Sequence, residues 1–138
     1  MSQNYNNHVR YNPPFHFVAI PLSLIGLGFA IYFLVNNFTS LNALLALAFL
    51  LIMAALLFAR MNAIKAQDRA ARADERLRYY ILAGKMLPNE LRMGQILALR
   101  FASDEEFLLL VDRTLKDNLS PKDIKLAIKK WRGDYHRI

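Results

Sequence analysis

The stretch that decides the fold runs from Phe17 to Ala59 and reads FVAIPLSLIGLGFAIYFLV, then NNFTS, then LNALLALAFLLIMAALLFA. Its two apolar runs, 17–35 and 41–59, have 19 residues each and contain no Asp, Glu, Lys or Arg. Because a helix rises about 1.5 Å per residue, each run would span roughly 28 Å, close to the hydrocarbon thickness of a bilayer. The sequence therefore predicts an all-α membrane protein built on a two-helix transmembrane hairpin over residues 17–59.

The charged residues lie almost entirely after this hairpin. Arg10 is the only one of the 18 Lys and Arg residues that precedes Arg60, and all 11 acidic residues follow it. Lys and Arg next to a span favour the cytoplasmic side, and the turn between the two runs has none. We therefore expect both termini to be cytoplasmic. The first run is longer than the apolar part of a signal peptide, so we expect it to be retained.

Proline and small residues modify the first run. Pro13 and Pro14 predict an extended approach to the span, and Pro21 predicts a strained or kinked first turn. Gly26, Gly28 and Ala30 form a small-residue face that lets another helix approach closely. This face is expected to pack on the second run, and the alternative is a dedicated dimer motif.

The composition excludes several kinds of chemistry. Without cysteine there are no disulfides, thiolate metal sites or iron–sulfur clusters. The histidines, His8, His16 and His136, have no zinc-site spacing, and no phosphate loop or nucleophile elbow is present. Neither run contains an ionisable residue, which disfavours transport or proton conduction. We therefore predict a protein that is not an enzyme and has no cofactor or metal.

The second run is predicted to continue as a cytoplasmic helical stem over residues 60–86, because no Gly or Pro interrupts residues 41–83. Small and apolar residues recur along the stem at spacings of three and four, a pattern typical of a helix that packs on another helix. We call this set the alanine seam and predict that it makes protein contacts, intramolecular or homodimeric: Ala63, Ala66, Ala70, Ala73, Leu77 and Tyr80.

A basic stripe lies about a quarter-turn from this seam and comprises Lys65, Arg69, Arg72 and Arg76. Because the stripe begins directly after the second run, the candidates for binding anionic lipid headgroups are Arg60, Lys65, Arg69 and Arg72. The alternative is a solvated face, on which Asp68 and Asp74 pair with Arg72 and Arg78 at i,i+4 spacing and partly neutralise the charge.

Residues 87–138 predict a module of three short helices, beyond an N-terminal polar segment (1–16), the hairpin and the stem. The first helix is expected over about 89–101. Ser103 with Glu106 predicts a capping box for the second helix, which should end near Asn118. Ser120 followed by Pro121 predicts the start of the third.

The third helix carries an apolar stripe and a basic arc. The stripe comprises Ile124, Ala127, Ile128, Trp131 and Tyr135, and Ile124, Ile128 and Trp131 are its candidates for protein contact. The basic arc provides further lipid-headgroup candidates: Lys122, Lys125, Lys129 and Arg132. The helix is expected to dock on neighbouring helices or to lie on an anionic membrane surface, and contact with nucleic acid is the least favoured alternative.

The chain resembles an uncharacterised family of small bacterial two-span integral membrane proteins. The similarity lies in LALRFASDEEF (97–107), NLSPKDIK (118–125) and AIKKWR (127–132), and in NHVRY (7–11) and FHF (15–17) before the first run. The resemblance covers nearly the whole chain and implies a location in the bacterial inner membrane. The family has no known function, so it implies no activity and no site residues.

These observations predict an integral membrane protein that acts as a non-enzymatic interaction or accessory subunit. Its partners would be membrane lipids together with a protein partner or further copies of itself. The alternative is a module that binds anionic lipids, and a membrane-tethered nucleic-acid binder is less favoured.

Overall fold

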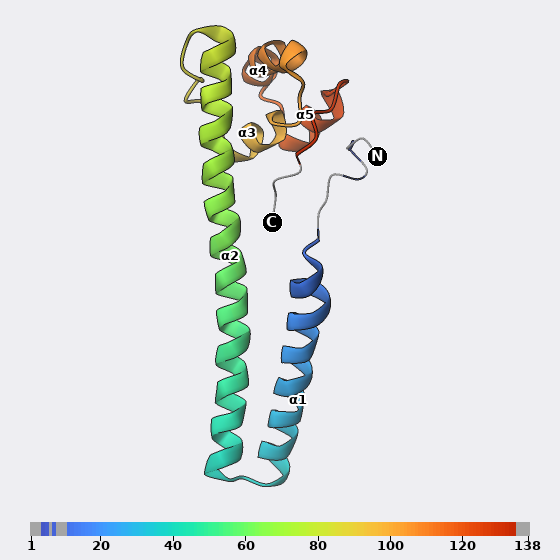
Figure 1. Cartoon of the computed structure of the whole chain (residues 1–138), viewed down its shortest axis with the longest axis vertical. Helices are drawn as coiled ribbons and strands as arrows, with labels where there is room; N and C mark the ends of the chain where they lie inside the picture. The colour runs from blue at the N-terminus through green and yellow to red at the C-terminus, as the bar shows by residue number, and fades with distance from the viewer. Residues whose placement is uncertain (1–3, 6, 8–10, 135–138) are drawn as a thin grey trace. The chain divides into compact units, whose positions relative to one another are not determined.

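The computed structural model describes Asn4, Tyr5, Asn7 and residues 11–134 (Figure 1). Helices make up this part of the chain, which contains no β-strand beyond one isolated bridge between Ala102 and Trp131. The elements in chain order are η1 (Pro14–Ala19), α1 (Ile20–Asn36), α2 (Ser40–Ala83), α3 (Met93–Leu99), α4 (Asp104–Asp117) and α5 (Pro121–Ala127). The predicted all-helical fold is confirmed. The predictions made for Arg10, His8, His136 and Tyr135 lie outside the described residues.

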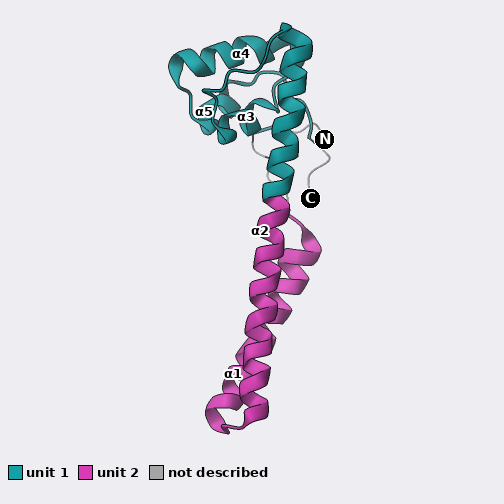
Figure 2. Ribbon diagram, turned by 90° about the vertical axis from the view of Figure 1, so that its left-hand side faces the viewer, with its two compact units in different colours: residues 1–10, 65–138 teal, residues 11–64 magenta. Residues whose placement is uncertain are grey.

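Two compact units divide the chain within α2 (Figure 2). The hairpin unit comprises Tyr11–Ile64 and contains η1, α1 and the first part of α2. The described residues from Lys65 onward belong to the second unit, which contains the rest of α2 and the three short helices.

The first run begins as a π-helix, and the predicted extended approach is wrong. Pro13 is already helical, with φ −59° and ψ −46°. Asn12 makes this start stable because its side-chain oxygen accepts a hydrogen bond from the Phe15 N–H at 3.1 Å. The Ile20 N–H then donates to the Phe15 carbonyl, five residues back. The wide π turns thus lie directly before Pro21, which has no N–H to donate to a regular helix.

Within the hairpin unit, the small face of α1 packs on α2 at Gly26. A Cβ on Gly26 would overlap the ring of Phe49, so this ring occupies the space that a side chain would need. Ala30 and Ser23 are also buried. Gly28 has nothing within 4 Å of a Cβ position, so it does not share this contact. The intramolecular alternative therefore holds for Gly26.

Both helices of this unit are long and apolar enough to cross a membrane. They are Pro14–Asn36, with 23 residues, and Ser40–Ala83, with 44. Their most apolar 18-residue windows have mean hydropathies of 2.3 and 2.7, and only 11% and 0% of these windows are buried. Neither window is therefore the buried core of this chain.

The predicted helical continuation of the second run is observed, since α2 runs unbroken to Ala83 and ends before the predicted limit at residue 86. Gly84 ends the helix in the left-handed region, with φ +67°, and its N–H donates to the Tyr80 carbonyl at 2.9 Å. Glycine adopts this conformation without the steric cost that a Cβ brings, which explains why α2 ends here.

The second unit has its own hydrophobic core, formed by one face of α2 and the elements that follow it. The core contains Tyr79, Leu87, Leu91, Ile96, Ala98, Leu99, Phe101, Ala102, Phe107, Leu110, Val111, Ile124 and Ile128. Tyr79 and Phe107 meet edge to face, with ring centroids 6.2 Å apart.

Helix α3 is shorter than the predicted 89–101. Gln95 stabilises the start of α3, because its side-chain oxygen accepts a hydrogen bond from the Arg92 N–H at 2.8 Å while its amide nitrogen donates to the Leu119 carbonyl at 2.9 Å. Gly94 lies where α3 meets α5, since a Cβ there would be 3.2 Å from Cγ of Pro121. The core takes up Leu91 and Phe101 outside the helix, so burial of these residues does not require helical backbone.

Helix α4 begins and ends where predicted, but its capping box is wrong. Ser103 makes no side-chain cap, and the Glu106 carboxylate instead accepts from the backbone N–H groups of Lys129 and Lys130, at 3.2 and 3.0 Å. The C-cap Asn118 is left-handed, with φ +46°. The Glu106 carboxylate thus holds a distant segment rather than its own helix start.

Helix α5 has the predicted Ser120 cap, whose hydroxyl accepts from the Asp123 N–H at 3.2 Å, but it ends at Ala127. From Ile128 the backbone is extended and pairs with the loop before α4. The Ser103 N–H donates to the Lys130 carbonyl at 3.1 Å, and the Arg132 N–H donates to the Phe101 carbonyl at 2.7 Å. The predicted longer helix is therefore wrong, because this pairing satisfies the backbone in place of further helical turns.

Candidate functional site

A buried carboxylate surrounded by arginines is the main polar feature of the second unit. Glu75 and Arg78 lie one turn apart on α2, and their side chains are 8% and 10% exposed. The Arg78 Nη1 donates to the Glu75 Oε2 at 3.0 Å. Arg132 approaches from the extended segment and places its Nη1 3.7 Å from the Glu75 Oε1.

Arg78 joins three parts of the unit through one guanidinium group. Besides Glu75, it contacts the Asp104 carboxylate, with Nε donating at 2.7 Å, and the Ala102 carbonyl, with Nη2 donating at 2.7 Å. Its Cζ also lies 4.2 Å from the centroid of the Phe107 ring. The planar guanidinium can make all of these contacts at once, which a lysine could not. Arg78 therefore ties α2 to the start of α4.

Burial sets the protonation behaviour of Glu75. Removal from water raises the pKa of its carboxyl above the ordinary value, because desolvation outweighs the opposing effects of Arg78, Arg132 and Arg100. A carboxylate in this environment is a good acceptor for fixed hydrogen bonds.

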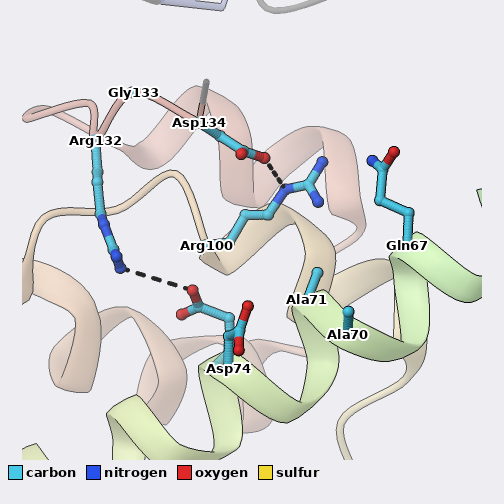
Figure 3. A pocket seen from close by; sticks show the side chains of 9 residues that line it. Gln67, Ala70, Ala71, Asp74, Arg100, Arg132, Gly133 and Asp134 are labelled. Carbon is cyan, nitrogen blue, oxygen red and sulfur yellow. Dashed lines mark ion pairs between the residues drawn. The ribbon is translucent and has the colours of Figure 1, made fainter. Parts of the chain in front are cut away.

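The cluster opens on a cleft of about 340 Å³ between α2 and the C-terminal segment (Figure 3). In the figure, Arg132 extends toward the carboxylates on α2, and Asp134 points to Arg100. The Arg100 Nε lies 3.1 Å from the Asp134 Oδ2. Two arginines and three carboxylates line the cleft, so its charges are largely balanced within the chain: Arg100, Arg132, Asp74, Glu75 and Asp134. No group of side chains among the described residues has the arrangement of a metal site.

Acidic residues of α4 also bind the C-terminal segment. The Glu106 carboxylate binds its backbone, and Glu105 forms an ion pair with the Lys130 ammonium. The Lys130 ammonium also donates a hydrogen bond to the Glu105 carboxylate, and this bond raises the pKa of Lys130 above the ordinary value. These contacts attach the segment after α5 to α2 and α4. We call them the lock: Glu75 with Arg132, Arg100 with Asp134, Glu105 with Lys130, and Glu106 with the backbone of Lys129 and Lys130.

Most of the alanine seam lies on the opposite side of α2 from this lock, whereas Ala70 lines the cleft. Ala73 and Leu77 each precede a buried residue, Glu75 or Tyr79, by two positions, which is about 200° around a helix. Ala66, Ala70 and Ala73 are exposed and Ala63 is half-buried. Leu77 is 60% exposed and Tyr80 53%. The hydrophobic core of the second unit therefore lies against the other face of α2, and the protein contact expected of the seam stays a prediction.

The chain belongs to the family of unknown function DUF6526. The sequence model of that family matches residues 1–138. No curated protein and no solved structure matches the chain.

The basic residues of this DUF6526 chain that were expected to bind lipid headgroups have different surroundings. Lys65 and Arg69 are exposed on α2, and so are Lys122 and Lys129 in the C-terminal region. Arg60 lies over the Phe15 ring at 5.7 Å within the hairpin unit. Arg72 is half-buried.

The four residues of the predicted basic arc are not carried by one helix. Helix α5 ends at Ala127, so Lys129 and Arg132 are not on it. The Lys125 ammonium lies 5.7 Å from the centroid of the Phe101 ring. Arg132 is directed to Glu75.

The apolar stripe packs inside the chain. Ile124 and Ile128 belong to the core of the second unit, and Trp131 packs against it, with its ring centroid 5.1 Å from that of Phe101. In this structure the three residues contact other elements of the same chain. Of the alternatives for this region, docking on neighbouring elements is the one observed.

Sequence reasoning missed Glu75, Arg78 and Arg100 as a cluster. The expected Asp74–Arg78 pair is replaced by the contacts of Arg78 with Glu75 and Asp104. One signal was available: Ala71, Glu75, Tyr79 and Ala83 recur every four residues and mark the face of α2 that contacts the core. A glutamate on such a face indicates a buried charge that needs a partner.

Proposed function

We propose that this DUF6526 chain is an integral membrane protein whose hairpin anchors a helical cytoplasmic unit, and that it serves as an interaction or accessory component rather than as an enzyme. The observation that carries the proposal is the pair of apolar windows in α1 and α2, of which 11% and 0% are buried.

Water is a poor environment for these windows. Large side chains such as Phe29, Leu44 and Leu50 are more than half exposed. Soluble monomers rarely expose apolar patches larger than a few hundred Å². A bilayer would cover the whole surface of both helices, whose length matches its hydrocarbon thickness.

The charge distribution supports an orientation with both ends in the cytoplasm. Arg60, Lys65 and Arg69 follow the second apolar run, and the turn after α1 has no charge. By the positive-inside rule, the second unit then lies in the cytoplasm. A bacterial inner membrane agrees with this orientation and with the absence of cysteine.

The interaction role is supported by the contrast between the two faces of α2. One face is covered by the core of the second unit, whereas Leu77, Tyr80 and Ile81 on the other remain in solvent. Glu75 and Arg78, the polar groups at the centre of the second unit, are engaged within the fold, so the exposed apolar face supports contact with a protein partner.

Membrane extraction and gentle purification test the proposal together. The full chain should remain in the membrane pellet at alkaline pH and should co-purify with a protein partner, or as an oligomer, in mild detergent. Release of the chain by alkali would contradict the membrane anchor. Recovery of a monomer in several mild detergents would contradict the interaction role.

A second candidate, binding of anionic lipid headgroups, is favoured by the exposure of Lys65 and Arg69 just after the apolar run. The full chain, placed in nanodiscs, should then unfold at a higher temperature when phosphatidylglycerol is added to phosphatidylcholine. Lys65→Gln with Arg69→Gln should abolish the difference, and Lys116→Gln with Arg113→Gln on α4 is the matched control. Equal melting temperatures in both lipids would exclude this function.

A further inference from the structure

The exposed face of α2 in the second unit has the pattern of one half of a helix pair. Its central positions are Ala66, Ala70, Ala73, Leu77 and Tyr80, at spacings of four, three, four and three. They extend over about 21 Å of helix. Leu77 and Tyr80 keep more than half of their surface exposed, and the neighbouring Ile81 keeps 70%. This face therefore carries large apolar side chains that the chain itself does not cover.

Two opposite charges border this face, one on each side. In heptad terms, Ala70 and Leu77 are a positions and Ala73 is a d position. Arg69 is then at g and Asp74 at e. Both are exposed at the edges of the seam, and Asp74 also lines the cleft beside Glu75.

In a parallel pair of identical helices, a g residue faces the e residue five positions further along the other helix. Arg69 of one copy would therefore face Asp74 of the other, and the same contact would form again by symmetry. In an antiparallel pair, g positions face one another, which would place Arg69 opposite Arg76 and bring like charges together. The charges thus select the parallel arrangement.

We propose that the partner on this face is a second copy of the chain, packed parallel and in register along α2. The proposal rests on the proposed membrane anchor, because insertion with one orientation makes the α2 helices of two copies parallel. Anchoring also confines both copies to one plane and raises their effective concentration. A seam rich in alanine, which buries little apolar surface, is therefore enough to hold the two helices together.

Disulfide formation between single introduced cysteines tests this geometry. The chain has no cysteine of its own, so each variant reports on one position. Ala70→Cys and Ala73→Cys should form covalent dimers on oxidation of native membranes, because a disulfide needs Cα atoms about 4.4–6.8 Å apart. Lys65→Cys, exposed but off the seam, and Ala71→Cys, on the core side, are the controls and should form several-fold less dimer.

A charge exchange tests the register independently. In the Ala70→Cys background, Arg69→Asp should lower the yield of covalent dimer, and so should Asp74→Arg, because each places like charges opposite one another. The double exchange should restore the yield, since the pair is then reversed but complementary. A role of either residue in folding or lipid binding alone would not be rescued in this way. Failure of the double exchange to restore the dimer would overturn the parallel register.

Alkaline extraction of the same membranes separates the two proposals. If the chain resists extraction and the seam cysteines form no more dimer than the controls, the second copy is excluded while the membrane anchor stands. If alkali releases the chain, the anchor fails and the inference fails with it. Dimer formation confined to the seam, in membranes that retain the chain, supports both.

Discussion

At the scale of single residues, Arg78 and Glu75 show how one buried ion pair organises the second unit. Arg78 contacts Glu75, Asp104 and the Ala102 carbonyl, and these groups belong to α2, α4 and the loop between α3 and α4. Burying the Glu75 carboxylate costs desolvation energy, which offsets much of what its contacts with the arginines contribute to stability. These contacts therefore fix the positions of α2, α4 and the loop between α3 and α4 as much as they stabilise the unit.

Replacement of Arg78 should therefore be costly. Arg78→Ala leaves the Glu75 charge buried without its nearest partner, and we expect a loss of about 3–5 kcal/mol in the free energy of unfolding of the second unit. Trp131, the only tryptophan of the chain, packs on the core and reports this unfolding by fluorescence in denaturant. Arg113→Ala, which breaks the exposed pair with Asp117, is the control and should cost less than about 1 kcal/mol.

The raised pKa of Glu75 predicts a specific dependence of stability on pH. The folded chain retains the Glu75 proton at pH values where the unfolded chain, near the ordinary pKa of 4.5, has lost it. The contribution of this group to stability therefore falls as the pH rises from 4.5 through the pKa of the folded state.

Glu75→Gln should remove this contribution. As the pH falls toward about 5, the unfolding free energy of the wild type should rise relative to that of the variant. The measurement is denaturant unfolding at several pH values, followed by Trp131 fluorescence. Glu90→Gln, at an exposed site, is the control. If the unfolding free energies of the wild type and Glu75→Gln differed by the same amount at every pH, the raised pKa of Glu75 would be contradicted.

At the scale of elements, the helices of the second unit begin and end according to long-range contacts as well as local signals. Ser120 caps α5 as its sequence predicts, whereas the Ser103 hydroxyl is buried without a hydrogen-bond partner. The difference arises because the Ser103 backbone joins the extended segment through its bond to Lys130.

The two serines should therefore respond differently to alanine. Ser120→Ala removes a cap and should lower the free energy of unfolding by about 1 kcal/mol. Ser103→Ala removes a buried hydroxyl that makes no bond, so stability should change little or rise. Thermal unfolding of the two variants side by side checks this, and a larger loss for Ser103→Ala would show that its hydroxyl has a partner after all.

At the scale of the whole molecule, the proposed topology makes opposite predictions for the turn and for α4. Phe38 in the turn and Asp112 on α4 are both exposed. In intact spheroplasts, Phe38→Cys should react with a maleimide that does not cross membranes, because the turn faces outward. Asp112→Cys should react only after permeabilisation. The reverse pattern would place the second unit outside the cell.

The sequence by itself determined the features that depend on local composition. The lengths of the apolar runs, the unbroken stem up to Gly84 and the Ser120 cap are properties of neighbouring residues, so they could be predicted without coordinates. The alanine seam was also visible, since its spacing follows from helical periodicity alone.

Only the tertiary structure decided which face of α2 is covered and where α5 ends. Both outcomes depend on residues far apart in the chain. The core lies on the side of Tyr79 because Phe107 packs there. The segment after α5 leaves the helical conformation because Glu106 and the Phe101 carbonyl accept hydrogen bonds from the backbone N–H groups of Lys129, Lys130 and Arg132. Periodicity shows that a helix has two faces, but the choice between them is made by what packs against it.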